Sequence, residues 1–255
     1  MILTNVLALK DNYIWILYDK NNSCIIVDPG ESNLVIKTII QKKLNPQAIL
    51  ITHYHRDHVD GVKNIVKKYP KIIVFGPKKE KNYSIHQIVK GGDKIHLLEN
   101  DIDVISTPGH TLNHISYYLK PYFFCGDTMF SAGCGRVFQD NYLSMYYSIQ
   151  LINSFPDDTI LCCSHEYTLS NLIFSMNFLP EDNNLKHYYR KVQKKIFLKK
   201  NIFPFYLYNE KKINIFLRTD DFILKKMMGF KKNKDSFEIF CYLRKNKDLF
   251  GAKRD

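Results

Sequence analysis

Short apolar runs rich in β-branched and aromatic residues alternate with amphipathic segments through the first part of this chain of 255 residues. Strand-like runs of this kind cover residues 13–18, 23–30, 47–53 and 71–76. The apolar spacing of residues 34–44 and 59–69 predicts helices between these strands. Such alternation predicts an α/β domain in which helices pack on a sheet.

Three further apolar runs, IDVISTPG, HISYYL and YFFCGDT, follow with little room for helices between them, so we expect them to form antiparallel strands. A helix over residues 143–155 and a strand over residues 159–167 are expected next. From about residue 169 the chain is Lys-rich, helical in pattern and free of strong strand signals. We therefore predict one domain of residues 1–168 and a smaller helical domain of residues 169–255.

Composition favours a soluble, cytoplasmic protein but selects no partner. The six cysteines include no C-x-x-C pair, which indicates reduced thiols in a reducing compartment and argues against both disulfides and a Cys-based zinc site. No segment approaches the roughly 18 unbroken apolar residues of a membrane helix, and the N-terminus does not have the pattern of a signal peptide. The formal charge of +12 suits nucleic acid, a membrane surface or an anionic small substrate, yet Lys, Asn, Ile and Tyr are abundant everywhere, as translation of an AT-rich genome produces.

The run T-H-Y-H-R-D-H at residues 52–58 crowds three histidines and an aspartate where a predicted strand ends. His53 and His55 are two apart in an extended segment, so their side chains point to the same side. Asp57 and His58 lie where the loop turns into the next predicted helix. Clustered His and Asp at this spacing favour a metal site, and the arrangement can supply one pair of ligands to each of two ions.

Three later strands end in the same way, with an apolar run, a small or turning residue and then a ligand. These ligands are His110 in TPGHT, Asp127 in FFCGDT and His165 in CCSHEYT. Because α/β sheets bind ligands at the rim formed by their strand ends, we expect these side chains to lie at one rim with those of residues 53–58. Imidazole and carboxylate suit zinc, and also iron or manganese.

The remaining histidines are expected to have other roles. A lone histidine is more often a surface or hydrogen-bonded residue than a metal ligand, and His86, His96 and His187 are interpreted in that way. His114, in TLNH, is closer in sequence to the ligand His110. We expect it to support the site or the fold and not to bind a metal.

The H-x-H-x-D-H run, with TPGHT, GDT and a later strand-end His, resembles the metallo-β-lactamase superfamily. This resemblance implies a four-layer αβ/βα sandwich with a dinuclear metal site at one edge. The segments GDTMFSAGCGRVF (126–138), SHEYT (164–168), INIFLRT (213–219) and LRKNKDLF (243–250) resemble successive motifs of the glyoxalase II (hydroxyacylglutathione hydrolase) family. The likeness runs nearly end to end and includes the helical C-terminal domain.

The resemblance implies two divalent metal ions, zinc above iron or manganese, and a role for each ligand. It assigns His53, His55 and His110 to the first ion, Asp57, His58 and His165 to the second, and Asp127 to both. It also implies hydrolysis of the thioester S-D-lactoylglutathione to D-lactate and glutathione, the second step of methylglyoxal detoxification. In this scheme a hydroxide bridging the ions attacks the thioester, and Asp57 and Asp127 act as ligands that position it.

Four residues match the positions that bind glutathione in that family, namely Arg136, Tyr167, Arg244 and Lys247. Arg244 and Lys247 lie at i and i+3 of a predicted helix, so they share a face and can clamp a carboxylate. We expect residues 169–255 to be the glutathione-binding domain of a monomer that has a small-molecule substrate and binds neither nucleic acid nor membrane.

The sequence departs from the family pattern in details of binding and loop shape. Phe138 stands where relatives can carry a Tyr that reaches the substrate, and Arg136 stands where some relatives carry Lys, which keeps the charge but changes its geometry. Asp140 and Ile215 replace a familiar Gly and Pro. None of these differences removes a metal ligand.

Three alternatives remain beside the thioester hydrolase. A nuclease on the same fold would use the positive charge, but the chain has no aromatic-rich basic platform of the kind that binds nucleic acid. A glutathione-dependent persulfide dioxygenase uses a single iron and does not need the full second set of ligands. A non-catalytic module that binds metal or nucleic acid would have no reason to retain every expected ligand.

Overall fold

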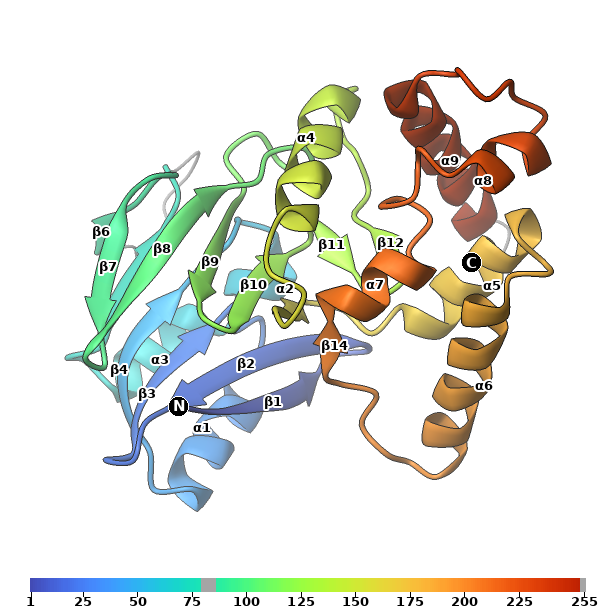
Figure 1. The fold of residues 1–255 in the computed structure, drawn as a ribbon. Coiled ribbons are helices and arrows are strands. Elements are labelled where there is room, and N and C mark those ends of the chain that lie inside the picture. The colour runs from blue at the N-terminus through green and yellow to red at the C-terminus, as the bar shows by residue number, and fades with distance from the viewer. Residues whose placement is uncertain (79–85, 253–255) are drawn as a thin grey trace. The chain divides into compact units, whose positions relative to one another are not determined.

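The structure, a computed structural model, describes residues 1–78 and 86–252 (Figure 1). The chain forms two compact units that interleave along the sequence. The first unit contains Met1–Thr107, Asn113–Gly126 and Cys162–Glu166, and the second contains Pro108–Leu112, Asp127–Leu161 and Tyr167–Asp255. The domain boundary expected near residue 168 stays a prediction.

A mixed sheet of order β1-β2-β3-β4-β5-β6 forms the centre of the first unit. Its strands are β1 (Ile2–Ala8), β2 (Asn12–Tyr18), β3 (Ser23–Val27), β4 (Asn45–Leu50), β5 (Ile73–Gly76) and β6 (Gln87–Ile88). The first three strands are antiparallel neighbours, whereas β3 to β6 run parallel. The carboxyl ends of β3 and β4 therefore meet at one edge, where the first candidate ligands begin.

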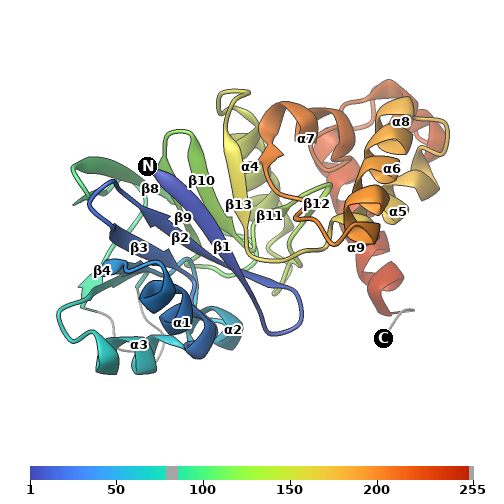
Figure 2. The ribbon, with the colours of Figure 1, turned by 90° about the horizontal axis from the view of Figure 1, so that it is seen from below.

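Helices α1 (Asn33–Gln41), α2 (Arg56–Val59) and α3 (Val62–Lys68) lie on one side of this sheet (Figure 2). Alternate strand residues such as Ile14 and Ile16 are buried in one apolar cluster with Val35 and Ile65 of the helices. The helix expected over residues 59–69 is present as α3, but it begins at Val62 and is separated from α2 at Gly61. The Gly61 N–H donates to the Pro29 carbonyl at 3.0 Å, and a Cβ there would lie 2.5 Å from the same oxygen.

A second sheet in the first unit has the order β13-β10-β9-β8-β7. It comprises β7 (Lys94–Leu97), β8 (Asn100–Ser106), β9 (Ile115–Leu119), β10 (Tyr122–Gly126) and the last two residues of β13 (Ile160–Cys163). Strands β7 to β10 are antiparallel, which confirms the expectation for the three apolar runs. The N–H of Ile115 donates to the Thr52 carbonyl at 3.0 Å and so ties this sheet to the loop that follows β4.

The second unit is mostly helical, as the sequence predicted for the C-terminal region. Its helices are α4 (Tyr142–Asn153), α5 (Thr168–Phe178), α6 (Asn183–Phe197), α7 (Leu207–Ile213), α8 (Phe222–Met227) and α9 (Ser236–Ala252). A hairpin of β11 (Met129–Phe130) and β12 (Gly133–Cys134) lies in the same unit. The sequence missed β14 (Phe205–Tyr206), which pairs with the start of β13, because two residues are too few to show a period.

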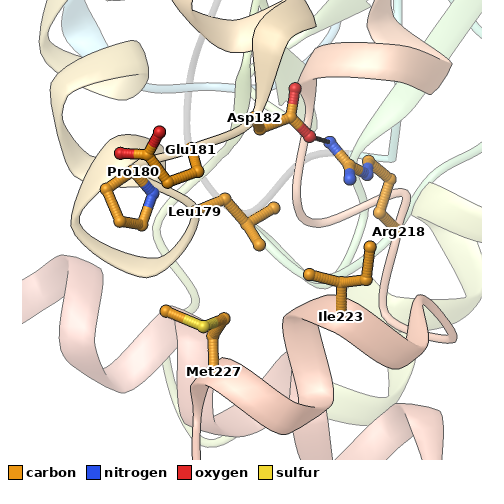
Figure 3. Close-up of a pocket in the computed structure, with 7 residues that line it drawn as sticks. All are labelled: Leu179, Pro180, Glu181, Asp182, Arg218, Ile223 and Met227. Atoms are coloured by element: carbon orange, nitrogen blue, oxygen red, sulfur yellow. Dashed lines mark hydrogen bonds and ion pairs between the residues drawn. The ribbon is translucent and has the colours of Figure 1, made fainter.

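A small cavity of about 220 Å³ lies near the start of α6 and α8 in the second unit (Figure 3). Its lining combines apolar side chains such as Leu179 and Met227 with the guanidinium of Arg218. Arg218 donates to the carboxylate of Asp182 at 2.8 Å and to that of Asp221 at 2.6 Å. Both carboxylates also accept N–H groups at helix starts, Asp182 on α6 and Asp221 on α8, so one arginine joins two helix caps.

Among the helices of the described ranges, none combines the length and the apolar character needed to cross a bilayer.

Candidate metal centre

The loop after β4 brings two imidazoles together in the first unit. His53 is buried, and its Nε2 lies 3.0 Å from Nδ1 of His55. The other nitrogen of His53 lies 3.1 Å from the hydroxyl of Thr52. His55 has an extended backbone and occupies the position before α2, so the alternation of an extended chain gives the two rings their common direction.

A second group of ligand atoms lies wholly within the first unit and consists of Asp57, His58 and His165. One nitrogen or oxygen from each lies within 4.8 Å of the others. The Asp57 Oδ2 atom is 3.3 Å from Nε2 of His165 and 3.6 Å from Nε2 of His58. Asp57 and His58 come from the first turn of α2, and His165 comes two residues after the end of β13.

In both histidines of this group, His58 and His165, the ring nitrogen that does not face Asp57 contacts a buried or half-buried carboxylate. Asp28 Oδ2 lies 3.0 Å from Nδ1 of His58, and Asp11 Oδ1 lies 2.8 Å from Nδ1 of His165. Since a carboxylate accepts the proton carried by Nδ1, this pairing directs the lone pair of each Nε2 toward Asp57. The pattern is the one that orients metal-binding histidines in proteins.

Asp28 is an important site residue that the sequence interpretation missed. It is 3% exposed and directly follows β3 with a left-handed backbone (φ 49°). Besides holding His58, its carboxylate accepts the N–H of Thr52 at 2.8 Å and the hydroxyl of Thr52 at 2.7 Å. The pattern of an apolar strand followed by a ligand, which identified the other candidates, is present at residues 23–28 and would have found it.

Asp11 and Asn12 were also missed. Asn12 pairs with His165 in an isolated β-bridge and donates its side-chain amide to Asp57 Oδ2 at 3.0 Å. Both residues precede or begin a strand, so the strand-end pattern does not detect them. Their partners, Asp57 for Asn12 and His165 for Asp11, lie more than 40 residues away in the sequence.

The remaining histidines lie in different environments. His114 is buried, with Nδ1 2.9 Å from the hydroxyl of Thr107, and its ring stacks on that of His53 at a centroid distance of 4.9 Å. His86 accepts the N–H of Val74, His96 pairs with Asp101 on the surface, and His187 is exposed.

The second unit contributes the pair His110 and Asp127, both buried. Nδ1 of His110 donates to the main-chain carbonyl of Arg136 at 2.8 Å. Because a carbonyl can only accept, the neutral ring has its lone pair on Nε2, which lies 3.3 Å from Asp127 Oδ2. The loop is tightly packed here, since a Cβ at Gly135 would lie 1.8 Å from the Asp127 carbonyl oxygen.

The donor atoms described for each unit fit a divalent metal ion. Two ligands at about 2.1 Å from one tetrahedral zinc lie roughly 3.4 Å apart. The donor pairs in the two units are separated by 3.0 to 3.6 Å. Imidazole nitrogens and carboxylate oxygens are also the ligand types that zinc, iron and manganese accept.

Two of the expected glutathione-binding residues are accessible in the second unit. Arg136 has an exposed side chain that lies 3.6 Å from the carboxylate of Asp248 and 6.0 Å from the ring of Phe138. Tyr167 is 37% exposed and packs edge-on against Phe130 at 5.1 Å. Both side chains can therefore contact a ligand without a change in the fold.

Arg244 and Lys247 lie on α9, as expected, but in different surroundings. Arg244 is 4% exposed and donates to the carbonyl of Cys134 at 2.7 Å and to Asp248 at 2.9 Å. Lys247 is half-buried, with its ammonium 5.1 Å from the ring centres of Phe174 and Phe250. Their joint clamp on a carboxylate stays a prediction.

The fold and the ligand geometry define a class of protein. Residues 11–165 match the family model described as metallo-beta-lactamase superfamily. A crystal structure of ETHE1 from Myxococcus xanthus has the same fold, with a TM-score of 0.67 and 20% identity over 96% of this chain and 91% of that one. The chain belongs to the metallo-β-lactamase superfamily, and the predicted α/β sandwich with a helical C-terminal region is confirmed.

A narrower family follows from the rest of the chain. Residues 166–250 match the model described as hydroxyacylglutathione hydrolase C-terminus. Relatives named hydroxyacylglutathione hydrolase share 57% identity in Buchnera aphidicola subsp. Schizaphis graminum and 48% in Erwinia tasmaniensis, each over 98% of this chain and 100% of the relative. Within the superfamily, the chain belongs to the hydroxyacylglutathione hydrolase family.

Proposed function

We propose that this chain hydrolyses the thioester S-D-lactoylglutathione to D-lactate and glutathione, the second step in removing methylglyoxal. The observation that carries the proposal is the match, over the full length of relatives named hydroxyacylglutathione hydrolase, in a chain that holds paired His and Asp ligands in both units. The nuclease, the persulfide dioxygenase and the non-catalytic module are not favoured, because four relatives at 45% to 57% identity carry the hydrolase name.

We further propose that two divalent ions bind, zinc above iron or manganese, with the ligands that the family resemblance implies. His53, His55 and His110 would hold the first ion, Asp57, His58 and His165 the second, and Asp127 both. Such ions, when bound, supply Lewis acidity toward the thioester carbonyl and lower the pKa of water toward neutrality. The oriented Nε2 atoms of His58, His165 and His110 support this assignment.

The residues of the chain have distinct tasks in this scheme. Asp28 and Asp11 keep the Nδ1 protons of His58 and His165 in place, so that neither ring has to change tautomer when it binds an ion. Asp57 and Asp127 serve as ligands that position the nucleophile. The departing glutathione thiolate is a good leaving group, so the reaction needs little help from a general acid, and no such acid is assigned.

Recognition of glutathione is assigned to Arg136, Tyr167, Arg244 and Lys247. The charges of the three basic residues complement the two carboxylates of glutathione, and the exposed Arg136 and Tyr167 can contact a ligand directly. Arg244 donates to the carbonyl of Cys134 at the end of β12, so its contribution includes holding that strand end. We propose that the enzyme works as a monomer in the cytoplasm, where a reducing environment suits six cysteines that form no disulfide in the described residues.

The test is release of thiol from S-D-lactoylglutathione by the purified protein after metal analysis, beside a lactoyl thioester that lacks the glutathione carboxylates. We expect rapid turnover of the first substrate, loss of that turnover with a chelator, and poor turnover of the second. A protein loaded with two metals that leaves S-D-lactoylglutathione intact would refute the proposed function. Equal turnover of both thioesters would refute only the basic glutathione site.

A further inference from the structure

In the second unit, two groups of the proposed metal site lie at the open end of the β11–β12 hairpin. They are the ligand Asp127 and the main-chain carbonyl that orients the ligand His110. Asp127 stands two residues before β11, and the carbonyl of Arg136, which accepts from His110 Nδ1 at 2.8 Å, stands two residues after β12. The N–H of Gly135 donates to the Thr128 carbonyl at 3.1 Å and closes this end. A shift of the hairpin therefore moves Asp127 and the residue that orients His110 together.

Glu210 of α7 binds the opposite end of the hairpin, where the chain turns. Its side chain is fully buried and accepts the hydroxyl of Ser131 at 2.7 Å and the N–H of Ala132 at 2.7 Å. Ala132 has a left-handed backbone (φ 58°), which is unfavourable for a residue with a Cβ. A buried carboxylate that accepts its N–H stabilises this conformation and fixes the turn.

Asn214 holds the same hairpin one helical turn further along the chain. It directly follows α7, and its N–H donates to the carbonyl of Glu210 at 2.8 Å. Its side-chain amide donates to the carbonyl of Gly133 at 3.0 Å and to that of Phe130 at 3.3 Å. These two carbonyls belong to opposite strands of the hairpin, so one amide ties the strands together.

We propose that Glu210, together with Asn214, is a positioning residue for the metal ligands Asp127 and His110. Neither side chain is assigned a contact with an ion or with substrate. Each acts through the hairpin, because rigid support of a ligand loop lowers the cost of assembling the ligand geometry. This inference rests on the proposed metal site and adds to it the residues that hold it in shape.

The experiment measures zinc affinity of the full-length protein. Apoprotein is titrated in competition with a chromophoric zinc chelator, and the folded fraction is checked by near-ultraviolet circular dichroism. We expect Glu210→Ala to weaken zinc binding by about 10-fold to 100-fold, the range seen when a residue supporting a metal ligand is removed. The effect should be largest for the ion assigned to both His110 and Asp127. Glu210→Gln, which keeps an acceptor for the Ala132 N–H, should recover most of the affinity.

The matched control is Asp182→Ala. The Asp182 carboxylate also accepts two backbone N–H groups in the second unit, at 2.9 and 3.0 Å, but it caps α6 and does not touch the hairpin. This variant should lower the free energy of unfolding and leave zinc affinity unchanged. If it weakens zinc binding as much as Glu210→Ala does, the effect is general destabilisation and the inference is overturned.

Two further variants separate the inference from the proposed function. Asn214→Ala gives an independent test if Glu210→Ala does not fold, and it should weaken zinc binding in the same way. His110→Ala removes a proposed ligand outright. If His110→Ala loses zinc while both supporting variants bind it as tightly as the wild type, the inference is wrong and the metal site stands. If His110→Ala also keeps both zinc equivalents, the proposed site is wrong and the inference falls with it.

Discussion

Replacing Asp28 by Asn tests the orientation of the metal-binding histidines with almost no change in shape. The left-handed backbone at residue 28 (φ 49°) is one that Asn also adopts readily, so the substitution adds no backbone strain. The N–H of Thr52 donates to Oδ1 of Asp28, which requires the amide oxygen at that position. The amide nitrogen then takes the place of Oδ2, which faces Nδ1 of His58 at 3.0 Å.

The new N–H group would donate to His58 Nδ1 and so drive the proton of the neutral ring to Nε2. A protonated Nε2 cannot bind a metal ion. If the proton stays on Nδ1 instead, Nδ1–H of His58 faces the N–H of the new amide, and two hydrogen-bond donors oppose each other in a buried site. We expect the affinity for the second ion to fall about 10-fold to 100-fold, equivalent to about 1.4 to 2.8 kcal/mol. Zinc titration of the apoprotein and thiol release from S-D-lactoylglutathione measure the two consequences.

Asp101→Asn is the matched control, because Asp101 also pairs with a histidine Nδ1, that of His96, at 2.9 Å but on the surface. It should leave metal content and turnover at the wild-type level. An Asp28→Asn protein that binds two zinc ions with wild-type affinity would refute the role assigned to Asp28, because the tautomer of His58 would then not limit binding.

Three further predictions concern backbone space and pH. Gly30→Ala should displace α2 and weaken metal binding, because its Cβ would lie 1.7 Å from the Asp57 carbonyl oxygen, and wild-type zinc affinity would contradict this. Gly251→Ala, in α9 with no atom within 4 Å of the added carbon, should be neutral or raise the free energy of unfolding by up to about 1 kcal/mol in urea titrations. Burial raises the pKa of Asp221, but hydrogen bonds from Arg218 and the α8 N–H groups lower it more, so its pKa is below 3.8. The resulting stability is present above pH 3.8 and is lost as the pH falls through the folded-state pKa. The free energy of unfolding of Asp221→Asn should therefore lie below that of the wild type near neutral pH, and the difference should shrink in acid.

The local sequence pattern was sufficient to predict a structural feature where one segment of the chain contains all the interacting residues. The strand ending in T-H-Y-H-R-D-H could be interpreted because His53 and His55 alternate in an extended chain, and Asp57 and His58 follow at once in α2. The antiparallel run of β8 to β10 was predictable for the same reason, since its connections leave no room for a helix. Where a helix start depends on a distant atom, as at Gly61 beside Pro29, the pattern placed the start of α3 at residue 59, three residues too early.

Partners far apart in the chain were decided only by the tertiary structure. Asp28 meets His58 across 30 residues, Asp11 meets His165 across 154, and Glu210 meets Ser131 across 79. A lone acidic residue in a sequence gives no sign of which donor it will face, because that depends on how strands and helices pack and not on local periodicity. The sequence by itself therefore determined which residues have metal-binding chemistry, whereas the fold decided which carboxylates orient those ligands and hold their loops in place.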